Sequence, residues 1–192
     1  MDRQAAYTLL QEYLQNKNLL KHSLGAEAAM RGIYNYLHKD DYSPETEELW
    51  GIVGLLHDID YEVVQKENKL DQHGKYLFDS GELSLPQIIK HAIRAHNFTM
   101  TGTDPESDLD WAITACDQLT GLIVAAALVH PDKKLKSLNS ETVLKRFGEK
   151  SFAKGANREA IRLCEKHLNI PLYQFIEIVL TSMKKIHIKL GL

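Results

Sequence analysis

The sequence is poor in cysteine and contains no long apolar run, and both shortages restrict the class of protein. Its two cysteines, Cys116 and Cys164, lie in apolar helical patterns and form no CxxC pair, so no disulfide framework is expected and a reducing cytoplasm fits. The longest apolar stretch, residues 122–129, is too short to cross a bilayer. The N-terminal residues include acids and lack the apolar segment of a signal peptide. We therefore predict a cytoplasmic protein that works away from membranes.

Strands are not predicted either, because no segment alternates strictly between apolar and polar residues. The apolar residues recur every three or four positions, which indicates amphipathic helices. The first stripe reads Ala6, Leu9, Leu10, Tyr13 and Leu14, and the second, within residues 19–37, reads His22, Ala26, Ala29, Ile33 and Tyr36. Ser43 and Pro44 have the residue types of an N-cap and a first helical residue. They predict a third helix, apolar almost all round, that ends near His57.

Turn and cap residues divide the second half of the chain in the same way. Residues 97–105 are predicted to form a loop, and Ser107 with Asp110 resembles a capping box. A short helix is predicted around 75–78, and Gly81 would end it. Longer helices are predicted from Pro86, from Ser107 to 129, over 140–148 and from Asn157 to 167. The last predicted helix starts at Pro171, and its apolar stripe reaches Leu190. The predicted fold is an all-α, single compact domain over residues 1–192, with roughly eight or nine helices.

The charge balance gives no sign of a polyanionic partner. The formal net charge is −3, with 23 basic and 26 acidic residues, so no global positive field is expected. The stretch 131–158 is basic, but only Phe147 and Phe152 are available in it for base stacking. We interpret this stretch as a solvated surface and do not expect a nucleic-acid partner. The sequence makes no prediction of the oligomeric state.

Four polar residues break the apolar pattern of their own helices. His22 lies on an apolar stripe, and His57 with Asp58 closes the most apolar helix. Asp117 lies on an apolar face of a later helix. Each alone could be a hydrogen-bonded core residue, but an unpartnered buried carboxylate costs roughly several kcal/mol. A shared divalent metal ion explains all four together, and the absence of thiolates argues against a structural zinc site.

The order of these residues resembles a known family. His22, then His57-Asp58 in GLLHDID, then Asp117 in ITACDQLTG is similar to the H…HD…D pattern of the HD-domain superfamily of metal-dependent phosphohydrolases. The resemblance implies an all-helical domain in which these four positions bind one metal ion. Adjacent residues point about 100° apart on a helix, so the HD pair shares an ion only where its helix ends. Many members read HDIG, whereas this chain has Asp60 at the glycine position.

The resemblance also implies a larger site. Some members hold two ions, with extra histidines between the HD pair and the last aspartate, and His73 and His96 have family-like spacing as second-ion ligands. His91 lies five residues before His96, roughly 140° around a helix, so it is expected to face the substrate or to be exposed. The metal-ligand core is expected over about residues 19–130, with C-terminal helices at 140–190 packed on it.

The implied activity is hydrolysis of a small phosphorylated substrate, a nucleotide phosphomonoester or phosphodiester, by attack of metal-activated water. The candidate ions are Mn, Fe, Zn, Co, Ni and Mg, with one required and a second left open. The expected substrate-binding residues are Arg94, His91, Lys75 and Lys21, and the expected general acid or base residues are Asp60 and Glu62. Two alternatives stay open: a di-iron oxygenase on the same scaffold, and a non-catalytic nucleotide-binding sensor.

Overall fold

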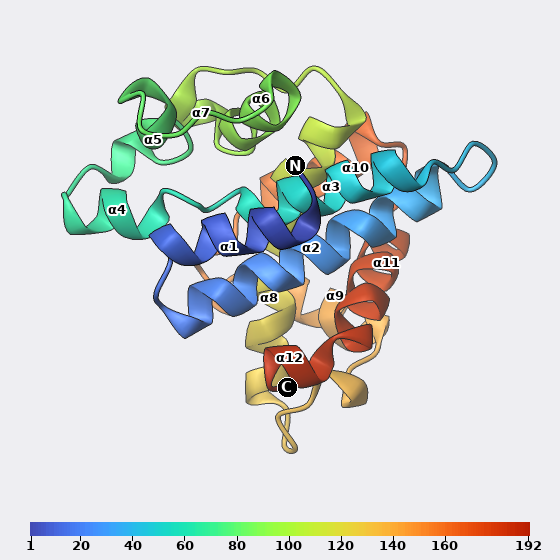
Figure 1. Ribbon diagram of the computed structural model, residues 1–192. Coiled ribbons are helices and arrows are strands. Elements are labelled where there is room, and N and C mark those ends of the chain that lie inside the picture. The colour runs from blue at the N-terminus through green and yellow to red at the C-terminus, as the bar shows by residue number, and fades with distance from the viewer.

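The computed structural model describes all 192 residues, which form helices and no strand (Figure 1). The all-α prediction is therefore confirmed. The longer helices are α1 (Arg3–Tyr13), α2 (Lys17–Leu37), α3 (Pro44–Leu56), α6 (Gln87–Ala95), α8 (Asp108–Val129), α9 (Ser140–Gly148), α10 (Arg158–His167) and α11 (Leu172–Lys185). The shorter ones are α4 (Tyr61–Lys66), α5 (Tyr76–Asp79), α7 (Phe98–Thr101) and α12 (His187–Leu190). Two 3-10 turns, Leu70–Gln72 and Leu135–Ser137, complete the chain.

The cap residues define the helix starts as the sequence predicts. The Ser43 side chain accepts from the Thr46 backbone N–H, with Pro44 as the first helical residue of α3. Ser107 and Asp110 form the predicted capping box of α8. These starts are predictable because a cap is a local device that satisfies the free N–H groups of the first turn.

Three short helices were not predicted, because four to six residues are too few to show an apolar period. They are α4, α7 and α12, and α7 lies inside the predicted 97–105 loop. The last helix is broken at Ile186, so Leu190 is buried from a separate turn. The apolar stripe of the second helix was predicted to end at Tyr36, but that side chain is 43% exposed, and Tyr34 is the buried tyrosine of this helix.

The helices pack around one continuous apolar core. α2 crosses the centre of the molecule and packs against α3, α8 and α11, while α10 covers α8 (Figure 1). The segment with α4 to α7 lies to one side of this centre, over the end of α3. The middle of α2, the end of α3 and the middle of α8 therefore meet beside the end of α6.

α8 is the one helix that could span a membrane by length and composition, and 61% of its most apolar window is buried in this structure. Its apolar residues contact α2, α6 and α10, so core packing accounts for its composition.

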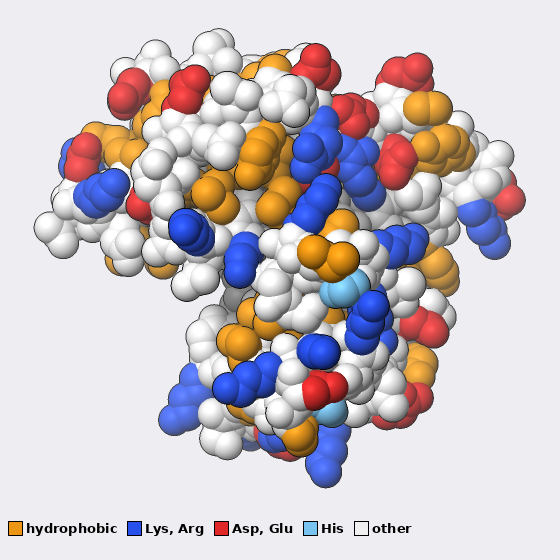
Figure 2. All heavy atoms as spheres, turned by 60° about the horizontal axis from the view of Figure 1, so that its bottom comes forward, with side chains coloured by type: hydrophobic (Ala, Val, Ile, Leu, Met, Phe, Trp, Pro, Cys, Tyr) orange, Lys and Arg blue, Asp and Glu red, His pale blue; other side chains and the backbone are white.

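The basic stretch after α8 lies on the surface. Lys133, Lys134 and Lys136 are exposed beside α12. Figure 2 shows that the Lys and Arg side chains of this face are interspersed with uncharged and acidic ones.

The crossing of α2 and α3 depends on Gly54. A Cβ atom at this position would lie 2.6 Å from the carbonyl oxygen of Ala26 in α2, which is backbone and cannot turn away. Gly54 therefore allows the two helix backbones to approach each other next to the end of α3.

We expect Gly54→Ala to lower the free energy of unfolding by about 1–3 kcal/mol, because the added methyl forces the two helices apart. Gly121→Ala in α8 is the matched control, since a Cβ there meets no atom within 4 Å. Replacing this exposed helical glycine should stabilise the protein by up to about 1 kcal/mol. Denaturant unfolding followed by circular dichroism measures both, and equal effects of the two substitutions would contradict the role of Gly54.

Candidate metal centre

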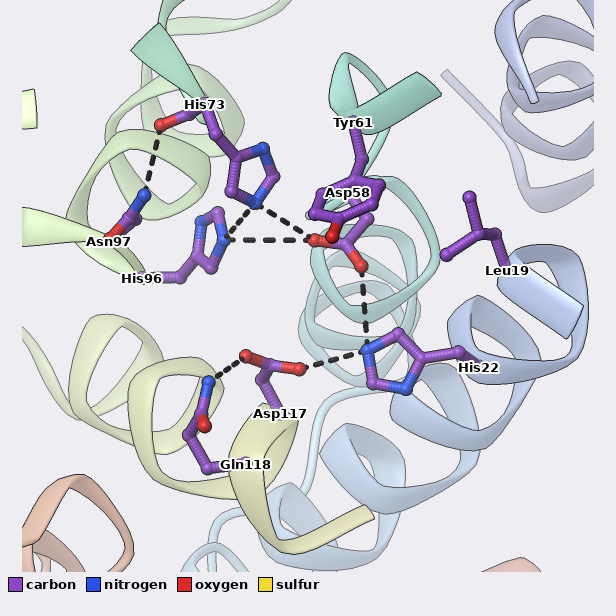
Figure 3. Close-up of a pocket in the computed structure, with 9 residues that line it drawn as sticks. All are labelled: Leu19, His22, Asp58, Tyr61, His73, His96, Asn97, Asp117 and Gln118. Atoms are coloured by element: carbon purple, nitrogen blue, oxygen red, sulfur yellow. Dashed lines mark hydrogen bonds and ion pairs between the residues drawn. The ribbon is translucent and has the colours of Figure 1, made fainter. Parts of the chain in front are cut away.

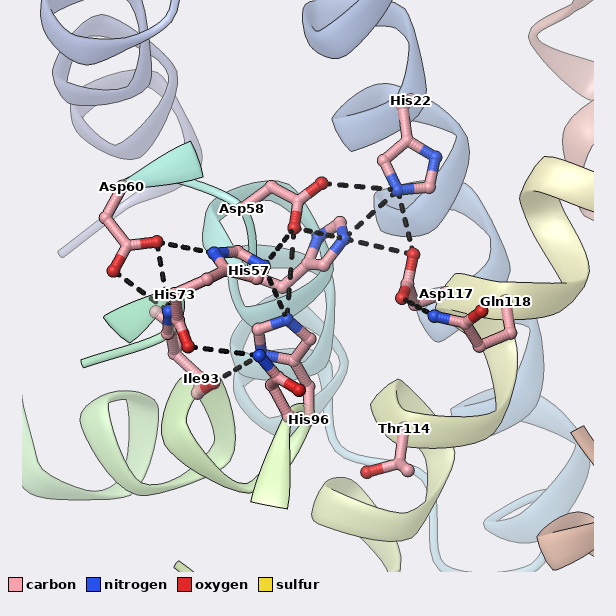
Figure 4. A network of polar contacts seen from close by, with 12 residues as sticks. His22, His57, Asp58, Asp60, His73, Ile93, His96, Thr114, Asp117 and Gln118 are labelled. Carbon is pink, nitrogen blue, oxygen red and sulfur yellow. Dashed lines mark hydrogen bonds and ion pairs between the residues drawn. The ribbon is translucent and has the colours of Figure 1, made fainter. Parts of the chain in front are cut away.

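The six predicted metal ligands converge at the meeting point of α2, α3, α6 and α8 (Figure 4). The predicted end of α3 is present: the helix stops at Leu56, and His57 is its C-cap. The chain then turns, so that the side chains of His57 and Asp58 both reach the same space. His96 is the C-cap of α6, and its side chain points into the same space.

The first group of ligand atoms surrounds the Nε2 atom of His22. This atom lies 2.9 Å from Asp117 Oδ1, 3.2 Å from His57 Nε2 and 3.4 Å from Asp58 Oδ2. Ligands bound to one ion at about 2.0–2.2 Å, at tetrahedral or octahedral angles, lie about 2.8–3.6 Å apart. The distances therefore fit a shared ion.

The second group uses the other oxygen of Asp58. Asp58 Oδ1 lies 3.1 Å from His73 Nε2 and 3.9 Å from His96 Nε2, and the two histidine nitrogens are 3.2 Å apart. Asp58 thus belongs to both groups, with one oxygen facing His22 and the other facing His73. If each group held an ion, Asp58 would contribute one oxygen to each.

The far nitrogens of the histidines fix the direction of their lone pairs. His57 Nδ1 lies 2.8 Å from the carbonyl oxygen of Gly54, and His96 Nδ1 bonds to the carbonyl of Ile93. A carbonyl oxygen only accepts, so both Nδ1 atoms carry the proton. Burial and the nearby charge of His73 lower the pKa of His96 to about 4, which keeps its Nε2 free.

The other two histidines are oriented in the same way by side chains. His73 Nδ1 donates to Asp60 Oδ1 over 2.7 Å. The Thr120 hydroxyl donates to the carbonyl of Asp117, which leaves its oxygen to accept from His22 Nδ1 over 3.4 Å. All four Nε2 atoms therefore point into one space, as metal-binding histidines require.

The pKa values show how protons on the histidines balance the charge of the carboxylates when no metal ion is bound. Burial lowers the pKa of His22, but its hydrogen bond to Asp117 and the charge of Asp58 outweigh burial and raise it to about 9. The same competition, with Asp58 and Asp60 as partners, raises the pKa of His73 to about 10. Burial raises the pKa of Asp58 and Asp117, but their histidine partners hold both pKa values below the usual range. Protons and a metal ion therefore compete for the same nitrogens.

Asp60 was predicted as a general acid or base, and the structure gives it a different contact. Its buried carboxylate accepts from His73 Nδ1 and from the backbone N–H groups of Gly74 and Tyr76, on the side of His73 away from Asp58 (Figure 4). It therefore orients a ligand and does not face the open cavity. Its φ of −93° is also accessible to any residue, so this turn does not require the glycine of HDIG.

Glu62 was also predicted as a general acid or base, and the structure does not place it in the cavity. Its carboxylate accepts from the backbone N–H groups of Gln15 and Asn16, between α1 and α2. The helical turn after Asp60 directs it to that connection, where it satisfies two amides.

Arg94 and His91 were predicted to bind substrate, but neither lines the cavity. Arg94 pairs with Asp79 over 2.6 Å, and His91 Nδ1 lies 3.3 Å from Asp110 Oδ2. Three residues apart, they share a face of α6 that differs from the direction of His96 at its end.

The two predicted lysines are also outside the cavity. Lys75 Nζ donates to the carbonyl oxygen of Met100 over 2.9 Å. Lys21 is exposed on α2 and extends toward Gly191 near the C-terminus. Adjacent to His22 in sequence, it points about 100° away around the helix, which explains the difference.

The ligands open onto a cavity of about 340 Å³ (Figure 3). It is lined by Leu19, His22, Asp58, Tyr61, His73, His96, Asn97, Asp117 and Gln118. Sequence reasoning missed the non-ligand members Leu19, Tyr61, Asn97 and Gln118. Two of them directly follow a predicted ligand in sequence, which was the available signal.

The comparisons with known proteins agree with this geometry. The family model of the HD domain matches residues 19–122, more than half of the chain, and this range includes all six ligands. No curated protein and no solved structure matches the chain. The family match, with the convergent histidines and aspartates, shows that the chain belongs to the HD domain family.

Proposed function

We propose that the chain is a metal-dependent phosphohydrolase that acts on a small phosphorylated substrate. One observation carries the proposal: the Nε2 atoms of four histidines and the carboxylates of Asp58 and Asp117 converge beside an open cavity. Divalent ions satisfy such a set, and hydrolases of the HD family use them. A nucleotide phosphomonoester or phosphodiester remains the expected substrate class.

The residues divide into two groups for this role. His22, His57, Asp58 and Asp117 would hold the first ion, and Asp58, His73 and His96 would hold the second. Bound ions would lower the pKa of a coordinated water toward neutrality and polarise a phosphoryl oxygen. Behind them, acceptors such as Asp60 and the Gly54 carbonyl keep the imidazole rings in place.

A di-iron oxygenase is the second candidate, and the position of Asp58 between the two groups favours it as much as it favours a dinuclear hydrolase. An iron-loaded sample that consumes oxygen with a substrate, and leaves phosphate esters intact, would support this alternative. The complete ligand set argues against a non-catalytic nucleotide sensor, which would bind nucleotide without turnover.

We expect the metal-loaded wild type to contain about two divalent ions per chain. His96→Ala should lose one ion and retain the other, because His96 belongs only to the second group. His91→Ala is the matched control on the same helix and should retain both, since His91 pairs with Asp110. Elemental analysis after reconstitution measures all three, and a wild type without metal would contradict the proposal.

We expect the metal-loaded protein to release phosphate from some members of a broad phosphate-ester panel. Asp117→Ala should lower kcat/KM by more than about a hundredfold, since even residues behind metal ligands contribute 10–100-fold. Glu62→Gln neutralises a carboxylate outside the cavity and should retain the activity. Phosphate release reports the result; a folded, metal-loaded wild type inactive on the whole panel would count against hydrolysis.

The raised pKa values of His22 and His73 predict a pH-dependent stability of the metal-free protein. A histidine whose pKa is higher in the folded than in the unfolded protein stabilises the fold, fully so at pH values below its unfolded pKa near 6.5. This stabilisation is lost as the pH rises through about 9 for His22 and about 10 for His73. The Tm of chelator-treated protein should therefore fall between pH 7 and 10, and saturating metal should remove the fall. The Asp58 and Asp117 pKa values lie below this window. A constant Tm of the metal-free protein over this range would contradict the prediction.

A further inference from the structure

The metal cavity offers a substrate no basic side chain. Apart from the ligands, it is lined by Leu19, Tyr61, Asn97 and Gln118, and no lysine or arginine is among them. The nearby cation Arg94 is already paired with Asp79. If the site works as proposed above, the ions must therefore neutralise the substrate phosphate without help from basic side chains.

Two of the non-ligand polar residues already have hydrogen-bond partners within the protein. Gln118 donates from Nε2 to Asp117 Oδ2 over 2.7 Å, and its Oε1 accepts from the Asn157 backbone N–H over 2.9 Å. Asn97 donates from Nδ2 to the carbonyl oxygen of His73 over 3.2 Å. Both therefore stabilise the ligands and their surroundings.

The hydroxyl of Tyr61 is different, because it has no hydrogen-bond partner. The ring of Tyr61 packs edge-on against His73, with centroids 5.2 Å apart, and this contact fixes its direction. Figure 3 shows the hydroxyl pointing into the space between the two ligand groups. Tyr61 is thus a neutral hydrogen-bond donor in the lining of the cavity.

Two further hollows adjoin the cavity. One, of about 250 Å³, shares His96, Asn97 and Gln118 with it and continues to the start of α10. The other, of about 320 Å³, shares His22, Asp117 and Gln118 and continues to the loop before α10. A phosphorus atom held at the ions therefore has room for organic groups in two hollows.

The charge of the substrate also matters, because no lysine or arginine lines the cavity. A phosphodiester carries one negative charge. A phosphomonoester is close to a dianion at pH 7, so it would bring one more negative charge into a mostly buried site that holds no basic side chain to pair with it.

We propose that this cavity selects phosphodiesters over phosphomonoesters, with Tyr61 donating a hydrogen bond to a non-bridging phosphate oxygen and the organic groups occupying the two hollows. The inference rests on the proposed phosphohydrolase function and names its substrate class. Water attacks phosphorus, one P–O ester bond breaks, and the leaving alkoxide or phenoxide takes up a proton from solvent, which gives a monoester and an alcohol or phenol.

The first test compares substrates that share a leaving group, using the full metal-loaded chain. Bis(p-nitrophenyl) phosphate should be hydrolysed with a kcat/KM at least about tenfold above that of p-nitrophenyl phosphate. Calorimetric titration provides a readout apart from turnover, in which diphenyl phosphate should bind at least about tenfold more tightly than phenyl phosphate. Faster hydrolysis and tighter binding of the monoesters would overturn the inference while leaving the phosphohydrolase proposal intact. Diester-selective binding without any hydrolysis would support the specificity and overturn the hydrolase function.

The second test changes the cavity itself. Tyr61→Phe removes only the hydroxyl and should lower kcat/KM for the diester about tenfold, the effect of one hydrogen bond to a charged group, with unchanged metal content. Leu19→Arg adds a cation to the lining and should shift the preference toward the monoester. Asn18→Arg adds the same charge one residue away, outside this lining, and should leave the preference unchanged. Equal diester kinetics in Tyr61→Phe and the wild type would remove the role of Tyr61.

Discussion

The structure is organised around one electrostatic constraint, the convergence of two mostly buried carboxylates and four imidazole Nε2 atoms. No apolar core tolerates this set without positive charge. In the metal-free protein, protons on His22 and His73 supply that charge, as their raised pKa values indicate. A metal ion would replace those protons at the same nitrogens. Ligand binding and stability are therefore two consequences of one arrangement.

The fold satisfies the constraint mainly at the ends of helices. His57 and His96 are both C-caps, and each uses its Nδ1 to satisfy a carbonyl in the last turn of its own helix. The same hydrogen bond that ends the helix thus aims the Nε2 atom at the site. Gly54 contributes twice, because it allows α2 close to α3 and supplies the carbonyl for His57. Backbone packing and ligand orientation are coupled at this residue.

The sequence was sufficient for the longer helices and for the inward-facing residues His22, His57, Asp58 and Asp117, since both leave a one-dimensional signal. A capped amphipathic helix has a period, and an inward-facing Asp117 on an apolar face breaks that period. The direction of Arg94 or Lys75 leaves no such signal, because a basic residue is compatible with any exposed face. Tyr61 was missed for the opposite reason: an aromatic residue near a buried turn looks like ordinary core. Which side chains line a cavity depends on how separate helices are oriented, and neither spacing nor composition specifies that.

Gln118 connects the proposed metal ligands to the part of the chain beyond the HD-domain match. It holds the second oxygen of Asp117 and accepts from the backbone of Asn157, the N-cap of α10. Arg158 then donates to the carbonyls of Ala153 and Ala156 in the loop before α10, which holds that loop beside the cavity. A change in the packing of α10 would therefore alter the orientation of a ligand carboxylate and the shape of both adjoining hollows. The C-terminal helices thus contribute to the geometry of the site through this contact, although every proposed ligand lies before them in the sequence.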